Sequence, residues 1–445
     1  MARRAWRGIA YLCLSLAAGK TLCSAQAIPV PAWAEFTGLG VSLRAIVPGT
    51  DCPPASVDGK SLAMTVRQAS SGEFPVTTCQ LLAPAGAKSA TIAGQAILLA
   101  RTRVNRIVVI GDTGCRLKGA QVQDCVDPEK WPFPRMTAKA AAQHPDLVIH
   151  VGDYYYRETP CPQDRPGCNG SPHGDLWDSW RADFFDPAAP LLTAAPWIFA
   201  RGNHEQCGRG SAGWFRFLDA GETPLTCPAA AVPFAVHLDH LNIDVIDSAD
   251  INDKQLSTDR LAQYQSQIAA IAPPTKDAKG APPSTGLDAT WVVTHKPLWG
   301  YELTTAGQAY LAQNPMLAAG VEMMDKPRAA QLPGVDLLVA GHVHMFAAID
   351  FSSGDASLRP GQLIVGDSGT SLDQADVRDG EQTVDGLDAK YFVRNTFGYF
   401  VLDRVKSRKK GHPDTWNGTL YGVDDSVLAN CQQRGRSIEC QPPAK

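Results

Sequence analysis

The sequence predicts an α/β domain, and three observations support this fold class. Seven short apolar runs lie between residues 104 and 405, separated by helical patterns and polar loops. The runs are apolar almost throughout, as strands buried on both faces of a sheet are. A polar motif closely follows most of them, as expected where loops gather at the carboxyl ends of strands. The predicted strands are Ile107–Ile110, Leu147–Val151, Trp197–Ala200, Ile243–Ile246, Trp291–Val293, Leu337–Ala340 and Leu363–Val365.

Residues 1–27 are predicted to be a signal peptide. The segment starts with basic residues (Arg3, Arg4 and Arg7) and continues with an apolar stretch from Gly8 to Ala18. Ala25-Gln26-Ala27 is a small-x-small cleavage site, so we expect the mature chain to start at Ile28. The apolar stretch is shorter than the about 20 residues that span a bilayer. The sequence thus predicts a secreted, periplasmic protein without a membrane anchor.

Residues 28–103 are predicted to form a small β-rich module. The segment Val41–Val47 alternates between apolar and polar residues, as a half-buried strand does. Asp58-Gly59 is a turn signal. No cluster of metal-ligating residues lies in this part of the sequence, so we expect the module to have a structural role.

The α/β domain is predicted over residues 104–405. Lys254–Ile271 has the periodicity of a helix, with Leu261, Tyr264 and Ile268 on one face. Ala272–Ala289 is rich in proline and glycine, which predicts a surface loop. Residues 406–445 are predicted to be a C-terminal tail with a basic start, in which we expect the charges to be solvated.

Cysteine usage agrees with export. Ten of the twelve cysteines lie beyond the signal peptide, and an oxidising compartment favours disulfides. We favour pairing between neighbours, although spacing alone leaves the connectivity open. A cysteine metal site is disfavoured because no Cys-x-x-Cys occurs. The neighbouring pairs are Cys52/Cys79, Cys115/Cys125, Cys161/Cys168, Cys207/Cys227 and Cys431/Cys440.

Five motifs carry side chains that suit a pair of metal ions. Two adjacent cations withdraw charge from phosphoryl oxygens and lower the pKa of a bound water, and they need a bridging carboxylate with further nitrogen and oxygen ligands. The motifs supply Asp112, Asp153, Tyr156, Asn203, His295, His342 and His344. The motifs are Gly111-Asp112-Thr113-Gly114, Gly152-Asp153-Tyr154-Tyr155-Tyr156, Gly202-Asn203-His204-Glu205, Val292-Val293-Thr294-His295 and Gly341-His342-Val343-His344.

In this order, over Val104 to Leu402, the motifs resemble those of the calcineurin-like metallophosphoesterases, and among them the purple acid phosphatases. The resemblance implies a two-layer mixed β-sandwich flanked by helices. It also implies that Asp153 bridges two metals and that His204 faces the substrate, where it binds the phosphoryl group and protonates the leaving oxygen. The implied ligands of the first metal are Asp112, Tyr156 and His344, and those of the second metal are Asn203, His295 and His342.

One departure points to the purple acid phosphatase subgroup. Most calcineurin-like enzymes have Asp-x-His in the first motif, but Gly114 occupies the third position here. Tyr156, three residues after Asp153, offers a replacement ligand. A phenolate is a hard donor, so the resemblance implies Fe(III) in the first site and a divalent ion (Zn, Mn or Fe) in the second.

Other polar residues receive different predictions. Plant and animal members of the family carry further histidines near the fourth motif, whereas Lys296 follows His295 here and is expected to bind a substrate oxygen.

Gly366-Asp367-Ser368-Gly369 resembles a serine-protease segment but is better explained as a strand-to-loop turn. The insertion Arg157–Pro196 is predicted to form a substrate rim, although its Trp177 and Trp180 also fit helix packing. Four histidines match no motif and are predicted to be ordinary surface or core residues: His150, His173, His237 and His240.

The favoured function is that of a secreted phosphatase that hydrolyses phosphate monoesters through attack by a metal-bound hydroxide. A phosphodiesterase or nucleotidase with the same site is the enzymatic alternative. A non-catalytic binding protein on a phosphoesterase scaffold is the third reading. The expected partner is a small phosphorylated substrate. The net charge of −4 argues against general electrostatic binding to nucleic acid.

Overall fold

A computed structural model describes the chain over residues 30–221, 227–271, 288–303, 309–322, 332, 334–351, 359–374, 377–384, 387–407 and 413–444. The predicted signal peptide, the expected mature start at Ile28, nearly all of the predicted loop 272–289 and part of the basic segment after residue 406 lie outside these residues. Within them, no helix is long and apolar enough to cross a membrane.

The described residues form two large sheets. The first has eleven strands in the order β27-β26-β25-β24-β9-β12-β13-β1-β2-β6-β5, and β9, β12 and β13 run parallel at its centre. In chain order its strands are β1 (Ala32–Thr37), β2 (Gly40–Pro48), β5 (Thr65–Gln68), β6 (Val76–Leu82), β9 (Arg106–Ile110), β12 (Leu147–His150), β13 (Trp197–Phe199), β24 (Gly398–Val405), β25 (Thr415–Gly422), β26 (Val427–Arg434) and β27 (Ser437–Gln441).

The second sheet has eight strands in the order β14-β15-β16-β19-β21-β20-β23-β22, of which β15, β16, β19 and β21 run parallel. Its strands are β14 (Phe234–Leu238), β15 (Leu241–Val245), β16 (Ala289–Val293), β19 (Leu337–Ala340), β20 (Phe346–Asp350), β21 (Gly361–Val365), β22 (Gly380–Val384) and β23 (Leu387–Arg394). All seven predicted strands are therefore present, with bounds that shift by at most two residues.

Smaller sheets complete the strand inventory of the described residues. A four-stranded sheet contains β3 (Ala55–Val57), β4 (Lys60–Leu62), β7 (Ala90–Ile92) and β8 (Gln95–Ile97). Two hairpins pair β10 (Leu117–Lys118) with β11 (Gln121–Val122), and β17 (Trp299–Leu303) with β18 (Ala309–Gln313).

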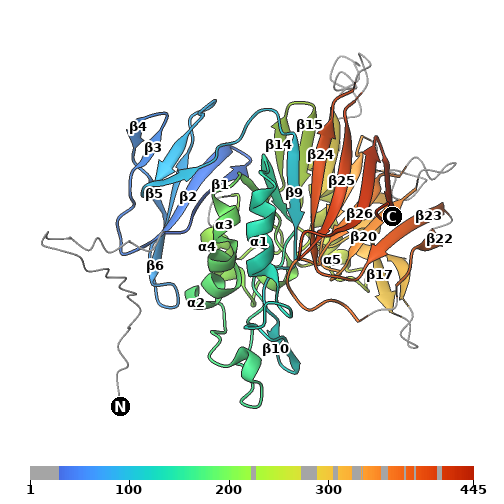
Figure 1. Ribbon diagram of the computed structural model, residues 1–445, viewed down its shortest axis with the longest axis horizontal. Coiled ribbons are helices and arrows are strands. Elements are labelled where there is room, and N and C mark those ends of the chain that lie inside the picture. Colours follow the sequence, from blue (N-terminus) through green and yellow to red (C-terminus); the bar gives the residue numbers. More distant parts are fainter. Residues whose placement is uncertain are drawn as a thin grey trace, which may run out of the picture.

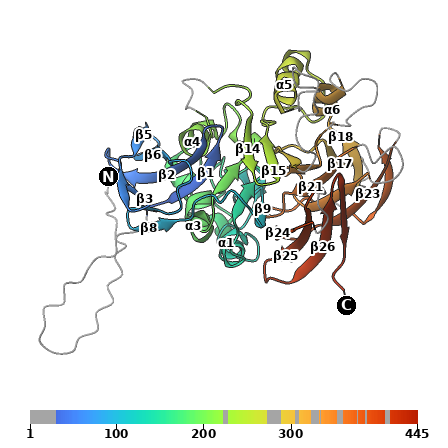
Figure 2. The same ribbon diagram turned by 90° about the horizontal axis from the view of Figure 1, so that it is seen from above.

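The two large sheets pack face to face, with helices on their outer faces (Figure 1). Alternate apolar residues of each central strand explain this arrangement: Ile107 and Val109 of β9 lie in the core between the sheets, while Val108 and Ile110 face the helices. The first sheet is covered by α1 (Phe133–Ala142), α2 (Trp177–Trp180), α3 (Asp186–Leu192) and α4 (Ser211–Phe217). The second is covered by α5 (Thr258–Ile271) and α6 (Pro315–Glu322), which lie side by side (Figure 2). The predicted two-layer mixed sandwich is confirmed.

The first sheet crosses both predicted domain boundaries. Strand β1 runs parallel to β13, with Glu35 opposite Trp197, so the N-terminal region extends the central sheet (blue in Figure 1). At the other end, β24 pairs with β25 across residue 406, and β25, β26 and β27 form the edge of the sheet (red in Figure 1). Most of residues 413–444 thus form strands of the sandwich, where a C-terminal tail was expected. Periodicity identifies strands but carries no information about which distant strand each one joins.

The helix predicted from Lys254 begins instead at Thr258. The side chain of Asn252 accepts hydrogen bonds from the backbone N–H groups of Lys254 and Gln255, which closes a turn and delays the start of the helix. Tyr264 and Ile268 are buried, as predicted for the apolar face. The five disulfides are those of the predicted neighbouring pairs.

Candidate metal centre

Strand direction brings the five motifs together. The first three follow β9, β12 and β13, which are parallel neighbours in one sheet, and the other two follow β16 and β19, which are parallel neighbours in the facing sheet. Because parallel strands end at the same edge, all five loops meet at one rim of the sandwich.

The hydroxyl of Tyr156 lies at the centre of a first group of donor atoms. It is 3.1 Å from Oδ1 of Asp112, 2.9 Å from Oδ2 of Asp153 and 3.1 Å from Nε2 of His344. Nδ1 of His344 lies 3.0 Å from the carbonyl oxygen of Ser371, which accepts its proton and leaves Nε2 as the nitrogen with a lone pair. Two carboxylates, a phenol and an imidazole therefore converge on one point.

A second group shares Asp153 with the first. Nε2 of His295 lies 3.3 Å from Oδ2 of Asp153 and 3.0 Å from Oδ1 of Asn203. Asp153, His295 and His342 each offer a ligand atom within 4.8 Å of the other two. Nδ1 of His295 bonds the carbonyl oxygen of Val151 at 2.8 Å, so its Nε2 is the nitrogen that remains for a ligand.

The electrostatics of these groups suit cations. Burial, followed by the charges of Asp153 and Asp112, raises the pKa of the Tyr156 phenol well above its usual value. Burial lowers the pKa of His295, but the charges of Asp153 and Asp112 and the hydrogen bonds of the ring together outweigh burial, and the pKa lies at about 9. Both shifts report a negative potential at the rim, which bound metal ions would neutralise. The donor set of carboxylate, phenol, imidazole and amide groups therefore fits metal binding.

Gly114 occupies the third position of the first motif, where its neighbours leave no room for a larger residue. A Cβ atom on Gly114 would lie 2.6 Å from the carbonyl oxygen of Tyr154 and 2.9 Å from Cδ2 of Tyr156. A histidine at this position would therefore collide with the tyrosine ring. The close contact gives a steric reason why glycine occupies this position.

Three of the ligand candidates have left-handed backbone conformations: φ is 56° at Asp112, 59° at Asp153 and 69° at His342. Such values are costly for residues other than glycine and occur where surrounding structure imposes them. Here the carboxylates of Asp112 and Asp153 accept hydrogen bonds from backbone N–H groups of neighbouring loops. The backbone N–H of His342 donates to Oδ2 of Asp112 at 3.0 Å, and that of His204 donates to Oδ1 of Asp153 at 2.8 Å. These bonds lock the loops to one another.

A family model of calcineurin-like phosphoesterases matches residues 105–346, more than half of the chain and all five motifs. The chain belongs to the calcineurin-like phosphoesterases. No curated protein sequence matches it.

Two solved structures share the fold. A purple acid phosphatase, PPD1, from seeds of yellow lupin (Lupinus luteus) is 12% identical, with a TM-score of 0.54 over 93% of this chain and 74% of the lupin chain. The structure of PhoD is 10% identical, with a TM-score of 0.50 over 94% of this chain and 92% of that one. At these identities the similarity concerns the fold alone, and the sandwich of this phosphoesterase agrees with both.

In the phosphoesterase, His204 lies beside the donor groups, and Glu158 contacts the side of its ring that faces away from them. Its Nδ1 is 2.8 Å from Oε1 of Glu158, and its Nε2 is 3.9 Å from Oδ2 of Asp153. The imidazole centroid is 3.8 Å from that of the Tyr156 ring. Burial lowers the pKa of His204 to about 4, against the opposing charge of Asp153. The sequence analysis did not single out Glu158, although it lies only five residues after Asp153.

Arg209 holds Glu158 in turn. Its guanidinium bonds both carboxylate oxygens of Glu158, and its Nη1 donates to the carbonyl oxygen of Asn203 at 2.8 Å. Burial raises the pKa of Glu158, but its hydrogen bonds with His204 and Arg209 outweigh burial and bring the pKa to about 2. Glu158 is therefore a carboxylate wherever the protein is folded at moderate pH.

Glu205, the last residue of the third motif, joins two ligand-bearing loops. Its buried carboxyl accepts hydrogen bonds from the backbone N–H groups of Asp153, Tyr154, Tyr155 and Gly202. Burial raises the pKa of Glu205 to about 8. Its place in the motif was a sequence signal for this role, but the side chain was not assigned one.

Lys296 is engaged with protein groups. Its Nζ donates to the carbonyl oxygen of Ile251 at 2.6 Å and to Oδ2 of Asp253 at 3.0 Å, and its side chain is only 7% exposed. The same Asp253 oxygen lies 3.1 Å from Nε2 of His342, which leaves Nδ1 of that ring free for a ligand. These bonds argue against the expected contact between Lys296 and a substrate oxygen, because the ammonium already serves Asp253. No motif marked Asp253, since it lies in an irregular loop.

Only the second part of the predicted substrate rim packs in the core, whereas residues 158–178 are largely exposed or half-buried. Trp180 and Phe184 are fully buried and pack with Tyr154 and Trp177 in the aromatic cluster beneath the first sheet. His150 is buried too, stacked on Tyr154 at 3.9 Å and bonded to Oγ1 of Thr113, as expected of an ordinary core histidine. Of the two readings of the tryptophans, helix packing is therefore correct.

The turn predicted at Gly366-Asp367-Ser368-Gly369 lies next to the first motif. Oγ of Ser368 accepts the backbone N–H of Gly111 at 3.3 Å and donates to the carbonyl oxygen of Gly398. This serine therefore braces the loop that carries Asp112. The segment belongs to the metal centre's support, as the strand-to-loop interpretation predicted.

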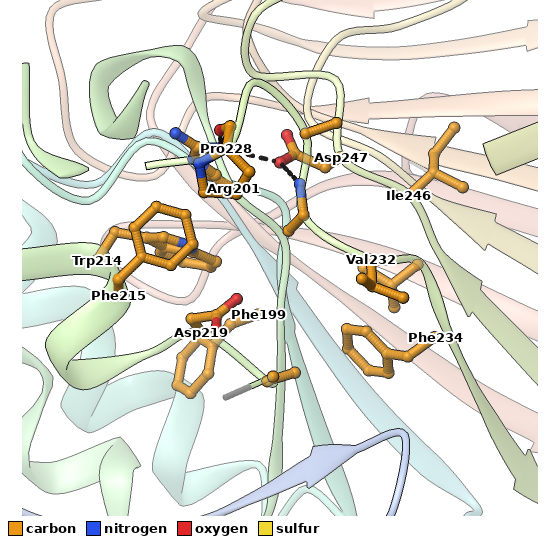
Figure 3. A pocket seen from close by; sticks show the side chains of 15 residues that line it. Phe199, Arg201, Trp214, Phe215, Asp219, Pro228, Val232, Phe234, Ile246 and Asp247 are labelled. Carbon is orange, nitrogen blue, oxygen red and sulfur yellow. Dashed lines mark hydrogen bonds and ion pairs between the residues drawn. The ribbon is translucent and has the colours of Figure 1, made fainter. Parts of the chain in front are cut away.

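Arg201, which precedes the third motif, belongs to a separate cavity of about 280 Å³ (Figure 3). Its Nη1 lies 3.1 Å from Oδ2 of Asp247, and its Nε donates to the carbonyl oxygen of Glu205 at 3.0 Å. Mostly apolar residues line the rest of this cavity, among them the aromatic Phe215 and Phe234 (Figure 3). None of the predicted site residues lines it, so Arg201 supports the loop from outside the metal centre.

Proposed function

We propose that this phosphoesterase is a secreted phosphatase that hydrolyses phosphate monoesters at a pair of metal ions. The observation that carries the proposal is the position of one oxygen atom. Oδ2 of Asp153 lies 2.9 Å from the hydroxyl of Tyr156 and 3.3 Å from Nε2 of His295, so it belongs to both donor groups. A carboxylate in that position is suited to bridge two ions.

Each donor group would hold one ion. Asp112, Tyr156 and His344 would ligate the first, for which a phenolate favours Fe(III). Asn203, His295 and His342 would ligate the second, a divalent ion (Zn, Mn or Fe). When bound, the pair withdraws charge from the phosphoryl oxygens and supplies a water of lowered pKa.

His204 supplies the proton for the leaving alcohol in this proposal. The carboxylate of Glu158 lies 2.8 Å from Nδ1 of His204 and attracts that side of the ring, while Nε2 lies 3.9 Å from Oδ2 of Asp153, on the side of the metal centre. Nε2 can then hydrogen-bond a phosphoryl oxygen and, when protonated, transfer its proton to the departing oxygen. Asp153 takes part by holding the centre together.

The proposed secretion is supported by five disulfides, which form and persist in oxidising compartments. The proposed route uses residues 1–27 as a signal peptide and leads to the periplasm. N-terminal sequencing of exported protein tests it, with Ile28 as the expected first residue. An exported protein that retains residues 1–27 contradicts it.

Hydrolysis of p-nitrophenyl phosphate and bis-p-nitrophenyl phosphate by the metal-loaded protein tests the activity. A higher kcat/KM on the monoester supports the proposal, whereas a preference for the diester supports the phosphodiesterase alternative. Turnover of neither ester, with both ions bound, supports a binding protein on a retired scaffold.

A further inference from the structure

Arg116 lies at the edge of the first donor group. Its Nη2 is 3.3 Å from both ring nitrogens of His344, and its Cζ lies 5.1 Å from the centroid of the Tyr156 ring. The residue is partly exposed and follows the first motif by two positions. A permanently charged guanidinium is therefore next to the phenol and the imidazole that we assign to the first metal.

Arg116 is held in a rigid segment. Its backbone N–H donates to Oε1 of Gln123 at 2.9 Å, and its Nη1 donates to Oε1 of Gln121 at 3.1 Å. The neighbouring Cys115–Cys125 disulfide closes the base of the β10–β11 hairpin. The side chain is thus presented toward the metal centre with little conformational freedom to lose on binding.

The tautomer of His344 decides what Arg116 can bond. Because Nδ1 of His344 donates to the carbonyl oxygen of Ser371, only Nε2 can accept a proton from Arg116. That nitrogen is also the one assigned to the metal. Within the described part of the chain, Nη2 of Arg116 has no acceptor other than His344. Once Nε2 binds a metal, the Nη2 protons need a new acceptor.

We propose that this acceptor is an oxygen of the substrate's phosphoryl group, so that Arg116 is a substrate-binding residue of the phosphatase. The inference rests on the proposed function. Guanidinium groups bind phosphoryl oxygens through short, charge-assisted hydrogen bonds. The position beside the first metal suits a contact with a phosphoryl oxygen on the side of the centre occupied by Tyr156, where His204 also lies.

The rival role is purely electrostatic. A cation beside the ring of Tyr156 also stabilises a phenolate, and in that case Arg116 would affect the metal and leave phosphate binding unchanged. The two roles differ in what they predict for metal content, for the visible spectrum of an iron–phenolate pair and for the affinity for phosphate. All three are measured on the same purified protein.

The test compares Arg116→Gln with wild type in the metal-loaded state, with inorganic phosphate as the probe in calorimetry. One lost charge-assisted bond predicts a Kd for phosphate weaker by about 10- to 100-fold and a raised KM, with metal content and spectrum unchanged. Arg116→Lys keeps the positive charge but loses the paired N–H donors of the guanidinium, so its affinity for phosphate should lie between those of Arg116→Gln and wild type. Lys130→Gln, at an exposed lysine shortly after the same hairpin, is the control and should bind phosphate as wild type does.

Two results would overturn this inference alone, and a third would overturn it together with the proposed function. If Arg116→Gln keeps both metals and binds phosphate as tightly as wild type, Arg116 does not bind substrate, while the proposed function stands. If Arg116→Gln loses metal or shifts the spectrum at unchanged phosphate affinity per loaded site, its role is electrostatic. A metal-loaded wild-type protein that binds no phosphate would instead contradict the proposed function together with this inference.

Discussion

Oε1 of Glu158 lies 2.8 Å from Nδ1 of His204, in a buried contact that Arg209 supports from the far side of the carboxylate. The carboxylate of Glu158 thus orients the imidazole of His204 toward the metal centre. It does so through His204 and Arg209 and not through the proposed metal ligands. In the proposed function, proton transfer is assigned to His204 and metal binding to the surrounding motifs. Mutations should therefore separate the two as well.

His204→Ala should retain both metals and lose turnover by about 10²- to 10⁴-fold, because one general acid is removed. The loss should be larger for an alkyl phosphate than for p-nitrophenyl phosphate, whose leaving group needs no proton. Metal analysis and steady-state rates on both esters check this. Wild-type turnover of the alkyl ester by the variant would reject the role of His204.

Glu158→Gln should lower kcat by about 10- to 100-fold while KM and metal content stay close to those of wild type, because the residue positions His204 and does not contact substrate. Glu129→Gln is a suitable control, since Glu129 is 72% exposed and pairs only with Arg135 among the described residues. An effect of equal size in both variants would show that the loss comes from general destabilisation.

Asp253→Asn should weaken the second metal site by about 10- to 100-fold, because the carboxylate holds Nε2 of His342 and receives Lys296. Metal competition with a chromophoric chelator measures the affinity without any need for turnover. Asp250→Asn is the control, as Asp250 lies in the same loop and pairs with Arg260. Unchanged affinity in Asp253→Asn would remove Asp253 from the metal centre.

Asp244, on β15, predicts a pH dependence of stability. Burial raises its pKa from 3.8 to about 6 in the folded chain, against an opposing effect of His237. Between these two values the folded state binds a proton that the unfolded state does not, so stability falls as pH rises through this window and then levels off. Asp244→Asn removes this fall. After allowance for partial solvent exposure, it should gain about 1 kcal/mol in free energy of unfolding at pH 7.

Urea denaturation at pH 7 and pH 3.5 checks the sign for Asp244. The variant and wild type should differ at pH 7 and agree at pH 3.5. Glu381→Gln, at a side chain 71% exposed, should show no such difference between the two pH values. A variant less stable than wild type at pH 7 would mean that the carboxylate of Asp244 has a stabilising partner.

The sequence predicted the strands and the motif residues because both are local patterns. An uninterrupted apolar run such as Leu337–Ala340 needs two covered faces, and the structure provides them. Strand order escaped prediction, because the pairing of Glu35 with Trp197 joins segments far apart in the chain. The C-terminal strands were missed for the same reason: their side chains alternate, but nothing local shows which edge they extend.

The supporting residues divide in a similar way. Glu158 and Glu205 lie inside or just beyond motifs, so a search for carboxylates within and next to the motifs would have found them. Asp253 and Arg116 reach the centre through loop geometry and a disulfide-closed hairpin, which no periodicity encodes. The contact of Lys296 with Ile251 likewise depends on where the loop before α5 folds back.

In the proposed function, Tyr156 ligates iron in a pair of ions bridged by Asp153. The most direct measurement is metal analysis of the purified protein together with its visible absorption spectrum, for wild type and Tyr156→Phe. We expect one iron and one divalent ion per active wild-type chain and a visible phenolate-to-iron band that the variant lacks, with the fold intact by circular dichroism. A fully active wild type that is colourless and free of iron would contradict it.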